Sequence, residues 1–269
     1  MGHLLWIFSR ELFEYQPLNE ITEYLEFKGN TVILVNGRPI EKLSTIPEYW
    51  DGPAIGLVSI QWARWIQKNT KLTPGVIFRP NEHDVSVFST HWYKYCINEP
   101  LFIPWGQIIN KKQQLNLSNK IFVRSNSSQK VFPGMLIDIN ELEYEINSLY
   151  KVTSVNACTM MAISSEKRIY DEWRFWIIDR KIVCYSGCSG DIKKQITDSS
   201  PTDGILNLLN EILKFNWLPD IAFTIDLAET DIGPRIVEPN ALSTSGLYKC
   251  DWKLLIDAVA ELALNEYIS

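Results

Sequence analysis

The feature that most constrains this chain is an acidic hairpin in the segment IAFTIDLAETDIGPRIVEPNALSTSGLY. Side chains alternate between the two faces of a strand, so Glu238 and Asn240 share a face while Pro239 points to the other. If the turn is centred near Ile232, Asp226 lies opposite Glu238. Two carboxylates that face each other across a strand pair repel, unless a cation lies between them. The hairpin therefore predicts a bound cation.

Magnesium suits such a site, because it takes hard oxygen ligands and usually only one or two protein carboxylates. Phosphate oxygens and water then complete its octahedron. Asp226, Glu238 and the amide oxygen of Asn240 provide suitable ligands. The alternative is an ordinary surface hairpin with solvated acids, which an isolated Glu-x-Asn pattern would favour. The rest of the chain decides between the two interpretations.

Composition excludes several classes of protein. With 269 residues, of which 46% are apolar, the chain can bury a core as one large or two smaller domains. No apolar run approaches the length of a membrane span, and the start MGHLLWIFSRELFEYQ lacks a signal-peptide pattern. We therefore expect a cytoplasmic protein that does not bind membranes. The net charge of -6 argues against non-specific binding to nucleic acid.

A polar stretch divides the chain into two regions. The segment NKKQQLNLSNK, residues 110–120, predicts a linker, and we place the domain boundary between residues 115 and 116. Before it, NTVILVNGRPI has the pattern of strands, whereas residues 54–69 place apolar side chains at helical spacing. Residues 1–115 are therefore predicted to form a small α/β unit, which is a candidate for substrate selection or homodimer contacts. Residues 116–269 mix strands and helices without regular βαβ alternation, which favours an α+β fold.

Three cationic residues stand out in the second region. The strand IFVRS ends beside Arg124, and the polar loop SNSSQK that follows it ends in Lys130. Backbone donors and hydroxyls of such a loop could cover phosphate oxygens, although the chain has neither a P-loop nor a GxGxxG motif. Taken singly, each cation would be an ordinary surface charge.

The third cation, Arg174, lies in a predicted strand. Glu172, Arg174 and Trp176 share one face of that strand, whereas Phe175 and Ile177 pack on the opposite face. Arg174 can then point into a polar cleft and reach a terminal phosphate. The alternative is a simple surface pair between Glu172 and Arg174, which contributes little to stability.

Together these segments resemble a known superfamily. The order VRSNSSQKVFPG, then DEWRFWIIDRKIV, then TIDLAETDIGPRIVEPNALSTSGLY resembles the ATP-grasp proteins, and more narrowly the clade named for its two arginines and one lysine. The resemblance covers roughly residues 120–267. It implies an α+β ATP-grasp fold in which ATP lies between two α+β lobes, at about residues 116–165 and about residues 166–269. A smaller N-terminal α/β domain would precede them.

The resemblance also implies roles for single residues. Arg124 would contact the α-phosphate and Lys130 a second phosphate, while Arg174 would contact the γ-phosphate; Lys130 and Arg174 would be the catalytic pair. Glu172 matches an acidic position beside that arginine. Magnesium, or manganese in its place, would be bound by Asp226, Glu238 and Asn240. The run from Met160 to Ser164, with Met161, Ala162 and Ile163, matches the hinge whose backbone pairs with adenine. Core filling is the alternative for the methionines.

The activity that the resemblance implies is that of an ATP- and magnesium-dependent carboxylate-amine ligase. Such an enzyme forms an amide or peptide bond through an acyl phosphate, and it releases ADP and phosphate. Ser243, Ser245 and Gly246 follow the metal ligands and could meet the substrate, with a tight turn as the alternative. The substrates could be small molecules, peptides or a protein tail. A phosphotransferase and a nucleotide-binding regulatory or interaction module without turnover stay open as other functions.

Overall fold

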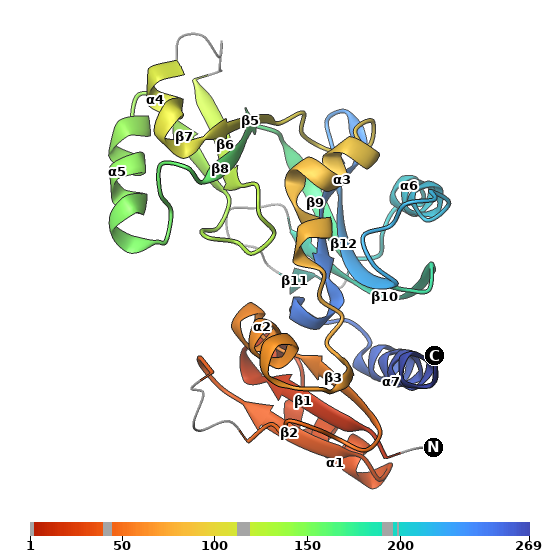
Figure 1. Ribbon diagram of the computed structural model, residues 1–269. Helices are drawn as coiled ribbons and strands as arrows, with labels where there is room; N and C mark the ends of the chain where they lie inside the picture. Colours follow the sequence, from red (N-terminus) through yellow and green to blue (C-terminus); the bar gives the residue numbers. More distant parts are fainter. Residues whose placement is uncertain (1–2, 40–44, 112–118, 190–195, 198) are drawn as a thin grey trace.

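The computed structural model describes residues 3–39, 45–111, 119–189, 196–197 and 199–269. Figure 1 shows three parts of the molecule, each built around one sheet. The predicted linker, residues 110–120, falls largely outside the described residues.

The N-terminal part is built on a parallel sheet with the strand order β2-β1-β3-β4. Its strands are β1 (Leu5–Ser9), β2 (Thr31–Val35), β3 (Pro53–Leu57) and β4 (Thr73–Gly75), and its helices are α1 (Leu18–Phe27) and α2 (Ile60–Asn69). This arrangement is the α/β unit that the sequence predicts.

The helix predicted in this unit is shorter in the structure than in the prediction. The predicted helix over residues 54–69 begins only at Ile60, because the residues from Pro53 to Leu57 form the buried strand β3. A strand that is covered on both faces has no polar alternation, so its pattern merges with that of the helix that follows.

A second sheet forms lobe one, with the strand order β5-β8-β6-β7. Its strands are β5 (Leu101–Pro104), β6 (Lys120–Ser125), β7 (Met135–Asp138) and β8 (Met160–Ser165), and its helices are α4 (Ile108–Lys111) and α5 (Leu142–Val152). One face of the sheet, with Ile121, Val123 and Met161, packs into the core of this lobe. Strand β5 precedes residue 115 and pairs with β8, so this sheet contains residues from both sides of the expected domain boundary. The boundary itself stays a prediction.

The third sheet forms lobe two, with the antiparallel order β11-β10-β9-β12-β13. Its strands are β9 (Ile169–Ile178), β10 (Lys181–Ser189), β11 (Ile196–Thr197), β12 (Ala222–Thr230) and β13 (Gly233–Ala241). The helices around it are α3 (Val85–His91), α6 (Asp203–Ile212) and α7 (Trp252–Ile268). Short 3-10 helices complete the described chain: η1 (Arg10–Phe13), η2 (Pro80–His83), η3 (Trp105–Gln107) and η4 (Leu242–Thr244).

The two faces of the third sheet have different neighbours. Phe175 and Ile177 pack with side chains of α3 and α6 on one face. On the other face Trp176 joins a core that includes Trp6 of β1 and Ile256 of α7. The predicted alternation along β9 is therefore confirmed. Figure 1 shows α7 beside the N-terminal sheet, so this helix connects lobe two to the first domain.

No helix in the described ranges is both long and apolar enough to cross a membrane. The expected cytoplasmic location stays a prediction.

Replacing Ile256 by Ala tests the packing of α7 against the N-terminal domain. Ile256 is fully buried in the core that α7 shares with β1. The cavity left by the substitution should lower the free energy of unfolding by about 3 kcal/mol, measured by urea denaturation. Leu254→Ala is the matched control, because Leu254 is 55% exposed on the same helix and its loss should cost at most about 0.5 kcal/mol. Equal losses would contradict this packing.

Candidate functional site

A row of four side chains crosses the third sheet on the face that carries Trp176. Ser186 lies opposite Arg174, Arg174 lies opposite Asp226, and Asp226 lies opposite Glu238. Paired positions of an antiparallel sheet direct their side chains to the same face. The predicted register of Asp226 with Glu238 is confirmed, and the two acids are neighbours on the sheet.

Arg174 neutralises the first of these acids. Its Nε donates to Oδ1 of Asp226 and its Nη2 to Oδ2, both at 2.7 Å, and the two residues are 5% and 1% exposed. Its Nη1 donates to the carbonyl oxygen of Gly246 at 3.3 Å, and its guanidinium lies 4.4 Å from the ring centre of Tyr248. Burial alone would lower the pKa of Arg174, but the charge of Asp226 and the hydrogen bonds to it raise that pKa overall. Arg174 is thus a buried cation and not part of a surface pair with Glu172.

The second acid is neutralised from lobe one. Arg124 Nη2 lies 2.8 Å from Oε2 of Glu238, and Lys130 Nζ donates to Oε1 at 3.0 Å. Asn240 Nδ2 also donates to Oε1, at 3.1 Å. Burial would raise the pKa of Glu238, but Lys130 and Arg124 hold it well below its usual value. The predicted cations and metal ligands therefore lie together, with Glu238 at the point where the lobes meet.

A bulge sets the direction of Glu238. The register between β12 and β13 shifts after Asp226, so that Leu227 lies opposite Ile236 and Val237 is the extra residue. Ile236 is buried in the core behind the sheet, whereas Val237 and Glu238 both line the cavity between the lobes. Bulges often redirect side chains next to functional sites, and simple alternation does not predict them.

The loop after Arg124 is held by the protein itself. Ser128 N donates to Asp84 Oδ1 at 2.8 Å, and Asn126 N donates to Met160 O at 2.9 Å. The hydroxyl of Ser128 donates to Pro80 O at 2.7 Å. These groups, which we expected to face phosphate oxygens, are bonded to protein in this form. Because residues 80–86 provide several of the partners, the N-terminal part of the chain holds this loop in place.

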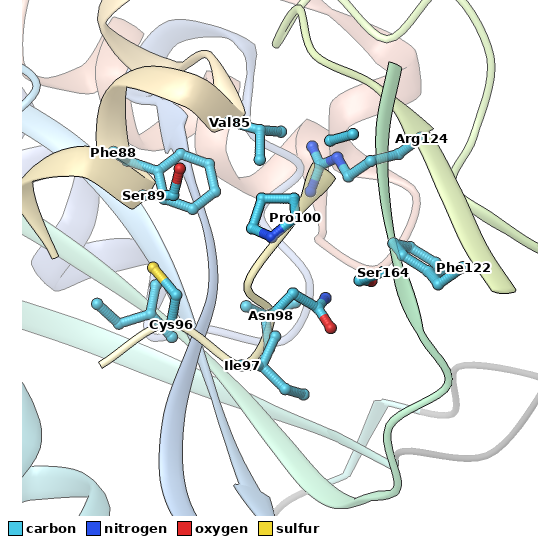
Figure 2. A pocket seen from close by; sticks show the side chains of 13 residues that line it. Val85, Phe88, Ser89, Cys96, Ile97, Asn98, Pro100, Phe122, Arg124 and Ser164 are labelled. Atoms are coloured by element: carbon cyan, nitrogen blue, oxygen red, sulfur yellow. The ribbon is translucent and has the colours of Figure 1, made fainter. Parts of the chain in front are cut away.

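The predicted adenine hinge is mostly core. Met161 and Ile163 are fully buried in lobe one, and β8 has β5 on one side and β6 on the other along this stretch. Their side chains therefore fill the core of this lobe, in agreement with the alternative for Met161, and the contact of this run with adenine stays a prediction. Ala162 and Ser164 instead line the small cavity between the lobes that Figure 2 shows.

Two of the expected substrate contacts belong to interior structure. Ser243 is fully buried, its hydroxyl accepts from Ile77 N at 2.9 Å, and its carbonyl accepts from Val58 N at 2.7 Å. The hydroxyl of Ser245 donates to Ala241 O at 2.8 Å. Ser243 lies in η4, which agrees with the tight-turn alternative, and substrate contact by this segment stays a prediction. Of the three expected substrate residues, Gly246 is the one that contacts Arg174.

A cavity of about 360 Å³ lies between the lobes, beside these charges. Arg124, Lys130, Glu172 and Glu238 line it, together with apolar residues. Glu172 is 4% exposed, on the same face of β9 as Arg174. Its predicted place in the cleft agrees with this position.

Two residues that the sequence did not single out also belong to this region. Tyr248 has a φ of 46°, which is rare for a bulky residue, and the guanidinium of Arg174 lies over its ring. His83 is 1% exposed, and neither ring nitrogen has a hydrogen-bond partner among the described residues. Burial lowers the pKa of His83 to about 4, although the nearby charge of Glu238 acts in the opposite direction. Neither residue lies in a periodic pattern, so only the fold reveals them.

The residues present fit magnesium and a nucleotide. Three cationic side chains surround the carboxylates of Asp226 and Glu238 and lie where an anionic ligand could contact them. Phosphate groups could take over Arg124, Lys130 and Arg174, and the oxygens of Asp226 and Glu238 would then be free for a metal ion. In the described ranges no cluster of three His, Cys, Asp or Glu side chains offers another metal site. Asp226, Glu238 and the amide oxygen of Asn240 would hold the ion.

A comparison with protein families decides the identity of the fold. Residues 87–261 match the model of an ATP-grasp domain, family 3 of the clade named for its two arginines and one lysine. The chain belongs to this family. The predicted ATP-grasp fold is thereby confirmed, and the family match begins before the expected boundary at residue 115. Among proteins of curated function, none matches the chain.

Solved structures agree with the ATP-grasp assignment at the level of the fold. D-alanyl-alanine synthetase A from Vibrio cholerae is 11% identical, with a TM-score of 0.65 and full coverage of both chains. D-cycloserine synthetase DcsG is 10% identical, with a TM-score of 0.62 over 97% of this chain and 100% of that one. The ATP-grasp ligase PsnB, solved with a minimal precursor, Mg and ADP, is 11% identical, with a TM-score of 0.57 over 98% and 99%.

The ion pair of Arg174 with Asp226 should be measurable as stability. Asp226→Asn leaves the buried guanidinium without a carboxylate, so the free energy of unfolding should fall by about 3 kcal/mol in urea denaturation. Asp231→Asn is the control, because Asp231 is exposed in the turn of the same hairpin and should change stability by less than about 0.5 kcal/mol. A similar small effect for both variants would mean that the pair does not exist in solution.

His83 should make the protein sensitive to mild acid. Its pKa falls from 6.5 to about 4 on folding, so the unfolded chain takes up a proton first and stability is lost as pH decreases between these values. Between about pH 7.5 and about pH 5, wild type should lose about 2 kcal/mol more than His83→Leu in urea denaturation. Parallel losses in the two proteins would show that His83 is protonated normally.

Proposed function

We propose that this ATP-grasp domain is an ATP- and magnesium-dependent ligase that joins a carboxylate to an amine. The observation that carries the proposal is the pairing of both acids with cations from two lobes. Each of the four carboxylate oxygens of Asp226 and Glu238 lies within 3.0 Å of a nitrogen of Arg174, Arg124 or Lys130. These contacts can be exchanged for a metal ion on the acids and phosphates on the cations.

ATP supplies an activated phosphoryl group, and magnesium neutralises part of its charge. The chain's own residues would provide the rest of the environment. Arg174 and Lys130 approach the same pair of acids from different lobes, so they can stabilise negative charge on the transferred phosphoryl group from two sides. Arg124 holds the phosphate nearer the nucleoside, and Glu172 lies in the wall beside them. In this step a carboxylate oxygen of the substrate would attack the γ-phosphorus of ATP and ADP would leave, which gives an acyl phosphate. An amine would then attack the acyl carbon, lose a proton and displace phosphate.

The substrate would meet the segment after β13 through Gly246, and not through the two buried serine hydroxyls. The carbonyl oxygen of Gly246 already contacts Arg174, which places this turn next to the proposed phosphoryl group. The solved relatives include enzymes named for D-alanine, D-cycloserine and a peptide precursor. Small amino acids and peptides are therefore the substrates that we propose to test first.

Hydroxylamine provides a direct test, because it captures acyl phosphates as hydroxamates. The protein would be incubated with ATP, magnesium, hydroxylamine and a panel of amino acids and short peptides, and ADP and hydroxamate would be measured. We expect both products in equal amounts with the correct carboxylate. Glu238→Gln should reduce the rate at least about 100-fold, since it removes a metal ligand and the partner of two cations. Glu211→Gln, on the exposed face of α6, should keep the wild-type rate.

The other functions give different results in the same assay. ADP with a phosphorylated product and no hydroxamate would identify a phosphotransferase. Nucleotide binding without ADP formation, with every carboxylate and with a cell extract, would favour a binding module. An unchanged rate in Glu238→Gln would contradict the metal assignment.

A further inference from the structure

A short crossing segment, residues 95–100, connects the two lobes. Ile236 N of β13 donates to Tyr95 O at 2.7 Å, and Ile97 N donates to Ile236 O at 2.9 Å, so the segment begins as an added pairing on lobe two. It then continues into β5, which pairs with β8 of lobe one. Asn98 lies between these two attachments. Its position is therefore fixed from both sides, at the place where the lobes face each other.

The amide of Asn98 has an unmet hydrogen bond. Its Oδ1 is buried and has no partner among the described residues. Figure 2 shows the amide end of Asn98 directed toward Ser164, inside a small cavity. Most of the lining is apolar: Val85, Phe88, Pro100, Phe122, Ala162 and Ile236. A buried acceptor without a donor destabilises a protein, and leucine would fit such surroundings better, so the amide calls for a ligand that brings a donor.

The cavity lies beside the proposed phosphate site. Phe122, Arg124 and Val237 line both this cavity and the larger one beside Glu238. It has a volume of about 20 Å³, room for about one water molecule, so a larger ligand enters only when the lobes move apart. A flat apolar ring between Phe122 and the strands of lobe two would fit this position once they separate.

The strand beside the cavity has few backbone groups that could contact a base. From Met161 to Ile163 β8 is paired on both sides, and beyond Ile163 its pairing in the sheet is with β6. A side chain that faces the cavity can therefore add to the recognition that the backbone after Ile163 provides. An amide is suited to adenine, because its oxygen accepts from the 6-amino group while its nitrogen donates to an adjacent ring nitrogen.

We propose that Asn98 reads the amino edge of adenine and thereby selects ATP over nucleotides with a 6-oxo purine. Oδ1 of Asn98 accepts from the 6-amino group and Nδ2 donates to N7, the neighbouring ring nitrogen that is an acceptor in both purines, so a 6-oxo group leaves one of the two contacts unmade in either orientation of the amide. The inference rests on the proposed function for the presence of a nucleotide in the cleft. It adds a specificity residue that lies outside the two lobe sheets, on the crossing segment.

Inosine triphosphate is the matched probe, because it carries an oxygen where ATP carries the amino group and has the same triphosphate. Binding of ATP and of inosine triphosphate, each with magnesium, would be measured by isothermal titration calorimetry. Wild type should bind ATP at least about 10-fold more tightly. Asn98→Leu should weaken ATP binding about 10- to 100-fold and leave inosine triphosphate within about twofold, so that the preference disappears. Asn210→Leu, on the exposed face of α6, should keep the preference.

The outcomes separate this inference from the proposed function. If wild type binds neither nucleotide, the proposed function fails as well. If it binds ATP but the preference is the same in Asn98→Leu, or if wild type has no preference, the inference about Asn98 alone is wrong. Thermal unfolding without nucleotide checks the fold, and Asn98→Leu should melt no lower than wild type because it removes an unmet acceptor. If it melts lower, Asn98→Ala takes its place with the same expected loss of preference.

Discussion

The structure depends on the placement of two carboxylates side by side on adjacent strands. Asp226 and Glu238 are neighbours on one sheet face, and their repulsion must be balanced by positive charge. The first acid is paired within its own sheet by Arg174, and the second is paired by Arg124 and Lys130 from the other lobe. The same electrostatic requirement thus holds one lobe against the other. A ligand that changes these pairings also changes the contact between the lobes.

Much of this site could be predicted from residue spacing. The period of a strand places Glu238 with Asn240 and Arg174 with Glu172, and a hairpin turn near Ile232 brings Asp226 opposite Glu238. These are local relations, and the structure has the predicted register. The motif order also identifies the ATP-grasp fold. Whether the predicted residues bind ATP, magnesium and substrate stays a proposal.

Other features depend on contacts between distant segments, which spacing does not reveal. The bulge at Val237 redirects a side chain without any local signal. Ser243 looks like a polar residue beside a metal site, yet its hydroxyl accepts from the backbone of Ile77. The loop after Arg124 looks free in sequence, but Asp84 accepts from its backbone. Strand β3 is hidden because a strand buried on both faces has no polar alternation.

The position of α7 has a consequence for how the chain folds during synthesis. This helix, Trp252–Ile268, provides part of the core that also contains Trp6 and Phe8 of β1. The N-terminal sheet is synthesised first, but one side of its core is completed only after the residues of α7 have left the ribosome. Until then, large aromatic side chains of β1 lack their final neighbours. The N-terminal domain therefore completes its core late, after the chain of lobe two has been synthesised.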